Sequence, residues 1–261
     1  MSAAKEVIAA CADRLYEAQR TRNAIAPLTQ EYPELTADDA YAIQLCNVNR
    51  LLAQGAHISG KKIGLTSLGM QQLLGVNEPD YGHLFTYMDC DVDVPTDELM
   101  QPKIEAEIAF ILGRDLPDRD VTREDVLDAT EYVCAAFEIV DSRVANWKIK
   151  LADTISDNAS SGRYVLGAKR VSPAGIDLAK VTMSTEKAGE GVISEGIGSA
   201  VMGDPAVSVA WLANCMRRYG VPLKKGEVVL SGAFAAAPPA KKGDVFTATF
   251  SSLGSVTARF Q

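Results

Sequence analysis

The feature that most constrains the fold is a change of sequence pattern at Gly60. From there to the C-terminus, short runs rich in β-branched and aromatic residues are separated by Gly, Pro and Asp, as in strands joined by turns. The runs are unevenly spaced and lack a βαβ rhythm, which favours an α+β fold with a mixed, curled sheet. The expected strands are 61–65, 83–88, 103–112, 133–141, 163–167, 181–186, 227–231, 244–250 and 255–260, and the expected helices among them are 67–74, 122–130 and 206–219.

The residues before this change have the pattern of helices. Apolar residues recur at helical spacing over 4–22. A second helix is expected to begin at Thr36, because Thr36 and Asp39 form a capping-box pattern with Asp in the place of Glu. The sequence therefore predicts a helical N-terminal section at 1–57 and a β-rich catalytic domain at 58–261.

The composition excludes several classes of function. The 261 residues are 47% hydrophobic and 23% charged, the balance of an ordinary globular protein. A net charge of −8 argues against nucleic acid or an anionic membrane as the main partner. Five cysteines without a C-x-x-C pair and two histidines do not indicate a zinc site. No apolar run approaches the roughly 20 residues that span a membrane, so a soluble, cytoplasmic protein is expected.

The segment 103–112 carries the most specific chemical signal. As a strand it places Glu105 and Glu107 on one face, between apolar neighbours. Two adjacent carboxylates repel each other unless a positive group lies between them, and hard oxygen ligands suit magnesium, manganese or calcium. The spacing alone leaves open an edge strand with one face in water.

A third carboxylate, Glu138, interrupts the apolar run 135–140. Burial of such a group is costly unless it is paired or bound to a metal. A neighbouring strand could bring it to the first two glutamates. The alternative is a buried salt bridge to Arg143 or Lys62.

Polar residues in three other segments are candidates for substrate contact. In 60–67 a lysine pair stands between glycines, and one lysine could face a pocket and meet a carboxylate; two surface lysines are the alternative. The glycine spacing is not that of a P-loop. The stretches 77–83 and 153–162 offer Asp, Tyr, His, Asn and Ser side chains, and ordinary loops are the alternative there.

These segments occur together and in a characteristic order. The full set is 62–67, 78–82, 102–108, 137–143, 147–150, 157–160, 226–232 and 254–256. In this set the chain resembles the hydratase and decarboxylase branch of the fumarylacetoacetate hydrolase superfamily over nearly its whole length. Within the branch it is most similar to the 2-hydroxypenta-2,4-dienoate (2-oxopent-4-enoate) hydratases of the meta-cleavage catabolism of aromatic compounds.

The resemblance implies a role for each matching residue. It implies a divalent metal, Mg²⁺ with Mn²⁺ as the alternative, held by Glu105, Glu107 and Glu138. It implies Lys62 and Asp80 as the catalytic residues. The substrate contacts that it implies are Leu65, Tyr81, Asn158 and Ser160. It also implies a β-roll core with a helical N-terminal part, and a homo-oligomer, which family members often build on fivefold rings.

The same resemblance implies a reaction. A 2-hydroxy-2,4-dienoate would chelate the metal through its carboxylate and 2-oxygen, ketonise with protonation at C5, and add water at C4 to give 4-hydroxy-2-oxopentanoate. Lys62 and Asp80 are the candidates for moving the protons. The metal and Lys62 would also offset the net negative charge for an anionic substrate.

Other functions stay open from the sequence. A 4-oxalocrotonate decarboxylase or a diacid 2-oxo-ene hydratase would share the metal motif, but a diacid substrate requires an extra basic group. A structural subunit that partners a related enzyme is the non-enzymatic alternative, and the intact glutamates and Lys62 argue against it. Association with a related decarboxylase or a downstream aldolase is left open.

Overall fold

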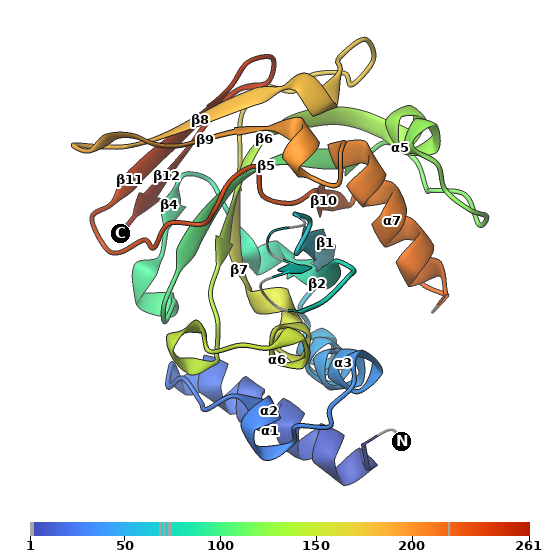
Figure 1. Cartoon of the computed structure of the whole chain (residues 1–261), viewed down its shortest axis with the longest axis vertical. Coiled ribbons are helices and arrows are strands. Elements are labelled where there is room, and N and C mark those ends of the chain that lie inside the picture. Colours follow the sequence, from blue (N-terminus) through green and yellow to red (C-terminus); the bar gives the residue numbers. More distant parts are fainter. Residues whose placement is uncertain (1–2, 68, 70, 73–74, 219) are drawn as a thin grey trace.

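The computed structural model describes the chain except residues 1–2, 68, 70, 73–74 and 219 (Figure 1). Its helices are α1 (Lys5–Thr21), α2 (Leu28–Glu31), α3 (Ala37–Ala53), α5 (Arg123–Ala129), α6 (Leu151–Ser156) and α7 (Pro205–Arg217). Its strands are β1 (Ile58–Gly64), β2 (Asp80–Phe85), β3 (Asp89–Cys90), β4 (Asp93–Val94), β5 (Lys103–Leu112), β6 (Thr130–Val140), β7 (Ser161–Leu166), β8 (Thr182–Lys187), β9 (Gly191–Ile197), β10 (Val228–Leu230), β11 (Val245–Phe250) and β12 (Gly254–Phe260). None of the described helices combines the length and apolarity needed to cross a bilayer.

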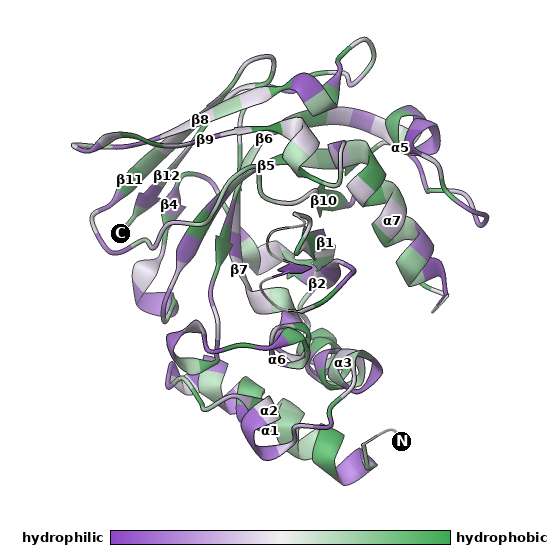
Figure 2. Cartoon of the chain, in the orientation of Figure 1, coloured by the Kyte–Doolittle hydropathy of each residue, from purple (hydrophilic) through white to green (hydrophobic). Residues whose placement is uncertain are grey.

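The N-terminal helices lie together at one end of the molecule, with α6 beside α3 (Figure 1). Both long helices were expected, and α3 begins at the predicted capping box: Asp39 N–H donates to Thr36 Oγ1, and Thr36 N–H donates to the Asp39 carboxylate. Polar and apolar residues alternate in stripes along α1 (Figure 2). Its buried face, with Cys11 and Leu15, joins α3 and α6 in one apolar cluster.

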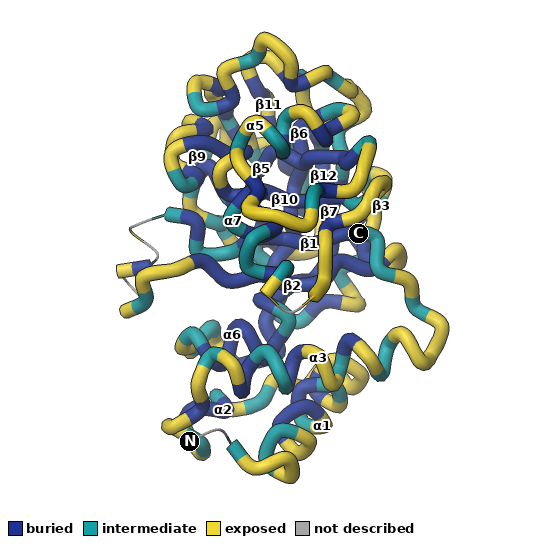
Figure 3. Tube along the Cα trace, turned by 90° about the vertical axis from the view of Figure 1, so that its right-hand side faces the viewer, coloured by how far each residue is buried: buried dark blue, intermediate teal, exposed yellow. Residues whose placement is uncertain are grey.

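Two mixed sheets, accompanied by α5 and α7, form most of the rest of the chain. The larger has the order β2-β1-β10-β5-β6-β7-β3, and the smaller has the order β4-β12-β11-β8-β9. The long central strands β5 and β6 are buried (Figure 3). Ile104, Ile108 and Phe110 face the cluster shared with the second sheet, while Ala109 and Ile111 face the other side of the sheet. The predicted alternation along β5 is therefore confirmed, and so is the α+β fold with a curled mixed sheet.

The edge-strand alternative for β5 is wrong. β10 and β6 pair with β5 on its two sides, and apolar residues cover both of its faces. The glutamate side of this strand is therefore buried from Glu107 onward, and only Lys103 and Glu105 at its start are half-buried.

Several boundaries differ from the prediction for local reasons. β2 begins at Asp80 rather than at residue 83, and residues 86–88 form a 3₁₀ turn, because the buried backbone of 80–82 pairs with β1 despite its turn-like composition. The short α6 and the edge strand β9 were not predicted; β9 is largely exposed and contains glycine and glutamate. The helix predicted at 67–74 lies partly outside the described residues. The division between residues 57 and 58 stays a prediction.

Candidate metal centre

Three glutamate side chains converge on one face of the β5–β6 pair. Glu105 lies directly opposite Glu138 in the antiparallel register, and Glu107 follows on the same face of β5. One carboxylate oxygen from each residue lies within 4.8 Å of the others. Like charges directly opposite each other destabilise a sheet, so this arrangement requires compensation by positive charge.

Burial makes that requirement stronger. Glu107 is 0% exposed and Glu138 is 1% exposed. Burial raises the pKa of Glu138 to about 7 and the pKa of Glu107 well above its ordinary value, and the neighbouring carboxylates add to the rise at Glu107. Gly232 N–H donates to Glu107 Oε2 at 2.7 Å, but Glu107 Oε1 and both Glu138 oxygens accept no hydrogen bond from the described residues. These oxygens form a donor set of the kind that hard divalent ions prefer.

Lys62 brings one positive charge to the carboxylates. Its ammonium lies 3.2 Å from Glu138 Oε1 as an ion pair and donates a hydrogen bond to the Ala159 carbonyl at 2.9 Å. Burial alone would lower the pKa of Lys62. The nearby carboxylates of Glu138 and Asp80 raise it by more, so the net shift is upward and the ammonium stays charged.

The contact between Lys62 and Glu138 is possible only because the sheet is curled. β1 and β6 are separated by β10 and β5, so their backbones would lie about 14 Å apart in a flat sheet. Through the register, Lys62, Leu230 and Ala109 lie on the face that carries the glutamates. The curl turns this face inward and brings the side chains from four strands to one place.

Asp80 approaches the same group from β2. It pairs with Gly64 in the β1–β2 register, two residues from Lys62, so Asp80 and Lys62 share a face. A Cβ atom added to Gly64 would lie 2.2 Å from Asp80 Oδ1 and 3.4 Å from Lys62 Nζ, so only glycine leaves room for this approach. Burial raises the pKa of Asp80, and Lys62 opposes the shift.

The carbonyl that binds Lys62 belongs to a left-handed turn. Asn158, Ala159 and Ser160 have φ values of 55°, 51° and 54°. A non-glycine residue in this region costs on the order of 1–3 kcal/mol, and such strain persists only where the surroundings impose it. Three consecutive strained residues therefore mark a segment that the fold holds in place against its local preference.

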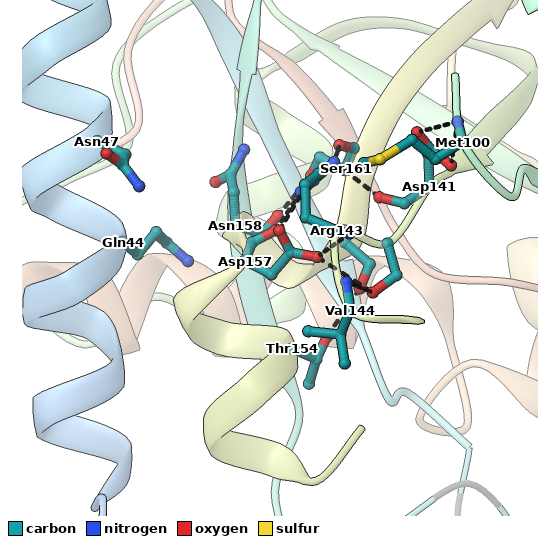
Figure 4. A network of polar contacts seen from close by, with 12 residues as sticks. Gln44, Asn47, Met100, Asp141, Arg143, Val144, Thr154, Asp157, Asn158 and Ser161 are labelled. Carbon is teal, nitrogen blue, oxygen red and sulfur yellow. Dashed lines mark hydrogen bonds and ion pairs between the residues drawn. The ribbon is translucent and has the colours of Figure 1, made fainter. Parts of the chain in front are cut away.

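A buried network holds the start of this turn (Figure 4). The Arg143 side chain bonds the Asp157 carboxylate and donates to the carbonyls of Asp141 and Ser161. Arg143 N–H also donates to the Asp157 carboxylate, at 2.9 Å. Burial raises the pKa of Asp157 to about 6, and Arg143 opposes this shift. Of the two partners that the sequence left open for a Glu138 salt bridge, Lys62 forms the ion pair and Arg143 does not, because Arg143 pairs with Asp157.

The four predicted substrate contacts lie in different surroundings. Leu65 has a left-handed backbone and precedes Thr66, whose side chain packs against Gly232, the residue that bonds Glu107. Ser160 is buried, with Oγ 3.4 Å from Thr154 Oγ1. Contact of Leu65 and Ser160 with the substrate stays a prediction.

The side chains of Tyr81 and Asn158 make other contacts in the structure, and their contact with the substrate also stays a prediction. Tyr81 pairs with Ile63 on the strand face opposite Lys62, and its ring stacks on Tyr41 with centroids 4.5 Å apart. Asn158 directs both polar atoms of its amide to the backbone of His83.

Some residues of the site were missed from the sequence. The Ala159 carbonyl, Thr154, Gly232 and the network of Arg143 with Asp157 received no assigned role. A glycine and a serine after the apolar strand β10 were visible as part of a motif, but a backbone carbonyl leaves no signal in a sequence.

Lys61 also departs from the expectation of a surface lysine. It lies on the face opposite Lys62, as strand alternation predicts, but it is 2% exposed and its ammonium donates to Glu227 Oε1 at 2.9 Å. We expect Lys61→Met to reduce the free energy of unfolding by up to about 3 kcal/mol, because Glu227 loses its partner in a largely buried place. Urea unfolding measures this loss.

The exposed Lys225 provides the matched control for that measurement. Lys225→Met should change the free energy of unfolding by no more than about 0.5 kcal/mol. A loss of the same small size for Lys61→Met would contradict the importance of the buried pair.

Comparison with known proteins agrees with this geometry. Residues 81–261 match the family model described as fumarylacetoacetate (FAA) hydrolase C-terminal. The 2-keto-4-pentenoate hydratase of Paraburkholderia xenovorans (strain LB400) is 48% identical over 253 residues, covering 96% of this chain and 93% of that protein. The 2-hydroxyhexa-2,4-dienoate hydratase of Comamonas testosteroni is 46% identical over 260 residues, covering 98% of each.

A solved structure extends the similarity to the whole fold. The 4-oxalocrotonate decarboxylase from Pseudomonas putida G7, complexed with magnesium and adipate, superposes with a TM-score of 0.95 at 36% identity, over 100% of this chain and 99% of that chain. The chain therefore belongs to the fumarylacetoacetate hydrolase family. Its relatives at 46–48% identity are hydratases, and the chain is accordingly an enzyme of the hydro-lyase class.

Proposed function

We propose that this enzyme is a metal-dependent hydratase that converts 2-hydroxypenta-2,4-dienoate (2-oxopent-4-enoate) to 4-hydroxy-2-oxopentanoate in the meta-cleavage catabolism of aromatic compounds. The observation that carries the proposal is the convergence of three glutamates, two of them buried and Glu105 half-buried, beside a buried lysine. The names of the relatives support the substrate class, since they describe hydratases of short 2-oxo or 2-hydroxy unsaturated acids. Homo-oligomeric assembly and association with a decarboxylase or aldolase stay predictions.

The metal ligands in this proposal are Glu105, Glu107 and Glu138. The unbonded buried oxygens of Glu107 and Glu138, together with the Glu105 carboxylate beside them, fit a hard cation, for which Mg²⁺ is the first candidate and Mn²⁺ the second. The magnesium in the similar decarboxylase structure supports the same choice. When bound, the ion would supply Lewis acidity toward negative charge on the substrate 2-oxygen.

Lys62 and Asp80 supply the remaining chemistry. The Lys62 ammonium is fixed beside the glutamates and would balance the substrate carboxylate. The Asp80 carboxyl shares its strand face, and burial raises the pKa of Asp80 above its ordinary value. Asp80 would therefore deliver and accept the proton at carbon, while Leu65 and Ser160 would line the substrate.

Lys62→Met is expected to lower kcat by about 100-fold, because it removes the charge beside the substrate carboxylate while keeping the length of the side chain. The melting temperature should show that the variant is folded. Lys225→Met, at an exposed lysine, is the control and should keep wild-type kcat. Equal kcat for the two variants would remove Lys62 from the catalytic group.

A diacid substrate is the second candidate. Lys103 favours it, because this lysine shares the strand face of Glu105 and its ammonium lies over the Trp147 ring, 4.2 Å from the centroid. Three other cations fit less well: Arg163 pairs with Glu98 from the face opposite Glu138, and Lys148 and Lys150 are exposed. A half-buried Lys103 held on an aromatic ring is a weaker partner for a distal carboxylate than a buried cation.

We therefore expect a higher kcat/KM for the five-carbon monoacid than for either diacid. Ultraviolet decay assays with magnesium would compare 2-hydroxypenta-2,4-dienoate, its six-carbon methyl homologue, 4-oxalocrotonate and the heptenedioate substrate. The extra methyl group should change kcat/KM by roughly 10- to 200-fold at most, whereas an unpaired distal carboxylate should cost more. Faster turnover of a diacid, with or without release of carbon dioxide, would overturn the substrate assignment but not the metal site.

A further inference from the structure

We propose that the left-handed turn at residues 158–160 positions the Lys62 ammonium, and that Asn158 is the positioning residue that holds the turn. The inference rests on the proposed function, since it concerns how Lys62 is presented to the substrate. It gives Asn158 a role other than the direct substrate contact that the sequence implied.

A lysine side chain needs a fixed acceptor if its ammonium is to occupy one place. The Lys62 stem has four rotatable bonds, and the paired Glu138 carboxylate is itself a candidate metal ligand. The Ala159 carbonyl is a different kind of partner, because it belongs to the backbone and accepts the Lys62 hydrogen bond at 2.9 Å. The direction of this carbonyl is set by the left-handed backbone of the turn, which therefore decides where the ammonium lies.

Asn158 ties that turn to the strand next to Lys62. Its Oδ1 accepts from His83 N–H at 2.7 Å, and its Nδ2 donates to the His83 carbonyl at 2.9 Å. This pair of bonds imitates a strand partner for β2. Gly82, the residue before His83, is the register partner of Lys62.

The contacts form a closed circuit. It runs from Lys62 across the strand pair to Gly82, along β2 to His83, through the Asn158 amide into the turn, and back through Ala159 to the ammonium. A Cβ atom added to Gly82 would lie 2.3 Å from the Asn158 carbonyl oxygen, so the turn sits directly on β2. Each hydrogen bond in the circuit is 2.9 Å or shorter, and apart from Lys62 itself, Asn158 is the residue that closes it through a side chain.

The test uses Asn158→Gly, because glycine accepts a positive φ without strain and the change removes only the amide bonds. Asn146→Gly is the matched control: Asn146 has φ 59° and is exposed. We expect Asn158→Gly to lower kcat by about 100-fold through displacement of the ammonium, with KM within about threefold of wild type. Asn146→Gly should keep both constants.

A double-mutant cycle with Lys62→Met separates positioning from substrate contact. If Asn158 acts through Lys62, adding Asn158→Gly to Lys62→Met should change kcat by less than about threefold. Additive losses, or a raised KM with unchanged kcat, would assign Asn158 to the substrate and overturn the inference. If Asn158→Gly does not fold, Ser161→Ala takes its place in the cycle, since it removes only the hydrogen bond from Ser161 Oγ to the Asn158 carbonyl.

A second readout is independent of turnover. Acetic anhydride labelling followed by peptide mass spectrometry should find Lys62 protected in the wild type and labelled several-fold faster in Asn158→Gly, with no change in Asn146→Gly. Unchanged labelling of Lys62 would overturn the inference even if the proposed function holds. If the wild type converts none of the 2-hydroxydienoates, the proposed function fails and the labelling still decides whether Asn158 holds Lys62.

Discussion

Removal of the divalent ion is expected to abolish turnover and to lower the melting temperature of the enzyme. Glu107 and Glu138 are buried, and burial raises the pKa of each, so without a metal ion Lys62 is left to offset the repulsion among the carboxylates in a poorly solvated place. A Lewis acid contributes several kcal/mol to a transition state of this kind, and each 1.36 kcal/mol is tenfold in rate. The loss of turnover should therefore be about 1,000-fold or more.

The measurement is dialysis against a chelator followed by titration with Mg²⁺ or Mn²⁺. At one hundred times its dissociation constant a ligand stabilises the folded state by about 2.7 kcal/mol, which corresponds to a rise of roughly 5–10 °C in the melting temperature. Activity and melting temperature should recover together in one titration. Full activity in a sample shown by elemental analysis to contain no metal would refute the metal site.

Glu107→Gln should lower turnover about as strongly as removal of the metal does. Unlike removal of the metal, it should raise the melting temperature of the metal-free protein. The amide keeps the shape of the side chain and an oxygen for Gly232 N–H, but it is a poorer ligand for a hard cation. We expect kcat/KM to fall by roughly 100- to 1,000-fold. Because one of the mutually repelling charges is gone, the metal-free variant should melt a few degrees above the metal-free wild type.

Steady-state kinetics over a range of magnesium concentrations, together with thermal unfolding in a chelator, test both halves of this prediction. Glu195→Gln, at an exposed glutamate of the edge strand β9, is the matched control and should change neither quantity. Near wild-type kcat for Glu107→Gln at saturating magnesium would mean that Glu107 is not a ligand. If metal-free Glu107→Gln melts below the metal-free wild type, the protein itself already compensates the charge of Glu107.

The glutamate face could be predicted because strand alternation is a local property. Glu105 and Glu107 are two residues apart, so any strand through them places both on one face, whatever the rest of the chain does. Glu138 could be predicted only as a costly charge in an apolar run, and its place opposite Glu105 depends on the pairing of two strands.

The surroundings of the lysines could not be predicted, because they depend on residues that are distant in the sequence. Lys61 was expected at the surface because lysine seldom lies buried, but its partner Glu227 is 166 residues away in the sequence. The turn at Asn158 contains no glycine, and although Asn adopts a left-handed backbone more readily than most residues, nothing local indicates one for Ala159 and Ser160; the bonds to His83 and the network around Arg143 hold it. Tertiary contacts of this kind override local preference.

The position of β10 between β1 and β5 has a consequence for the synthesis of the protein. β10 pairs with β1 in parallel, where Gly60 lies opposite Val228, and with β5 in antiparallel orientation, where Val229 lies opposite Phe110. The lysine strand and the glutamate strands therefore have no direct neighbour relation until a segment close to the C-terminus has left the ribosome. Contacts so distant in sequence are slow to form, and a nascent chain that has reached β7 already contains all three glutamates without the strand that joins them to Lys62. The three glutamates on the paired strands β5 and β6 can therefore come together first, and the charge of Lys62 reaches them only after β10 has joined the sheet.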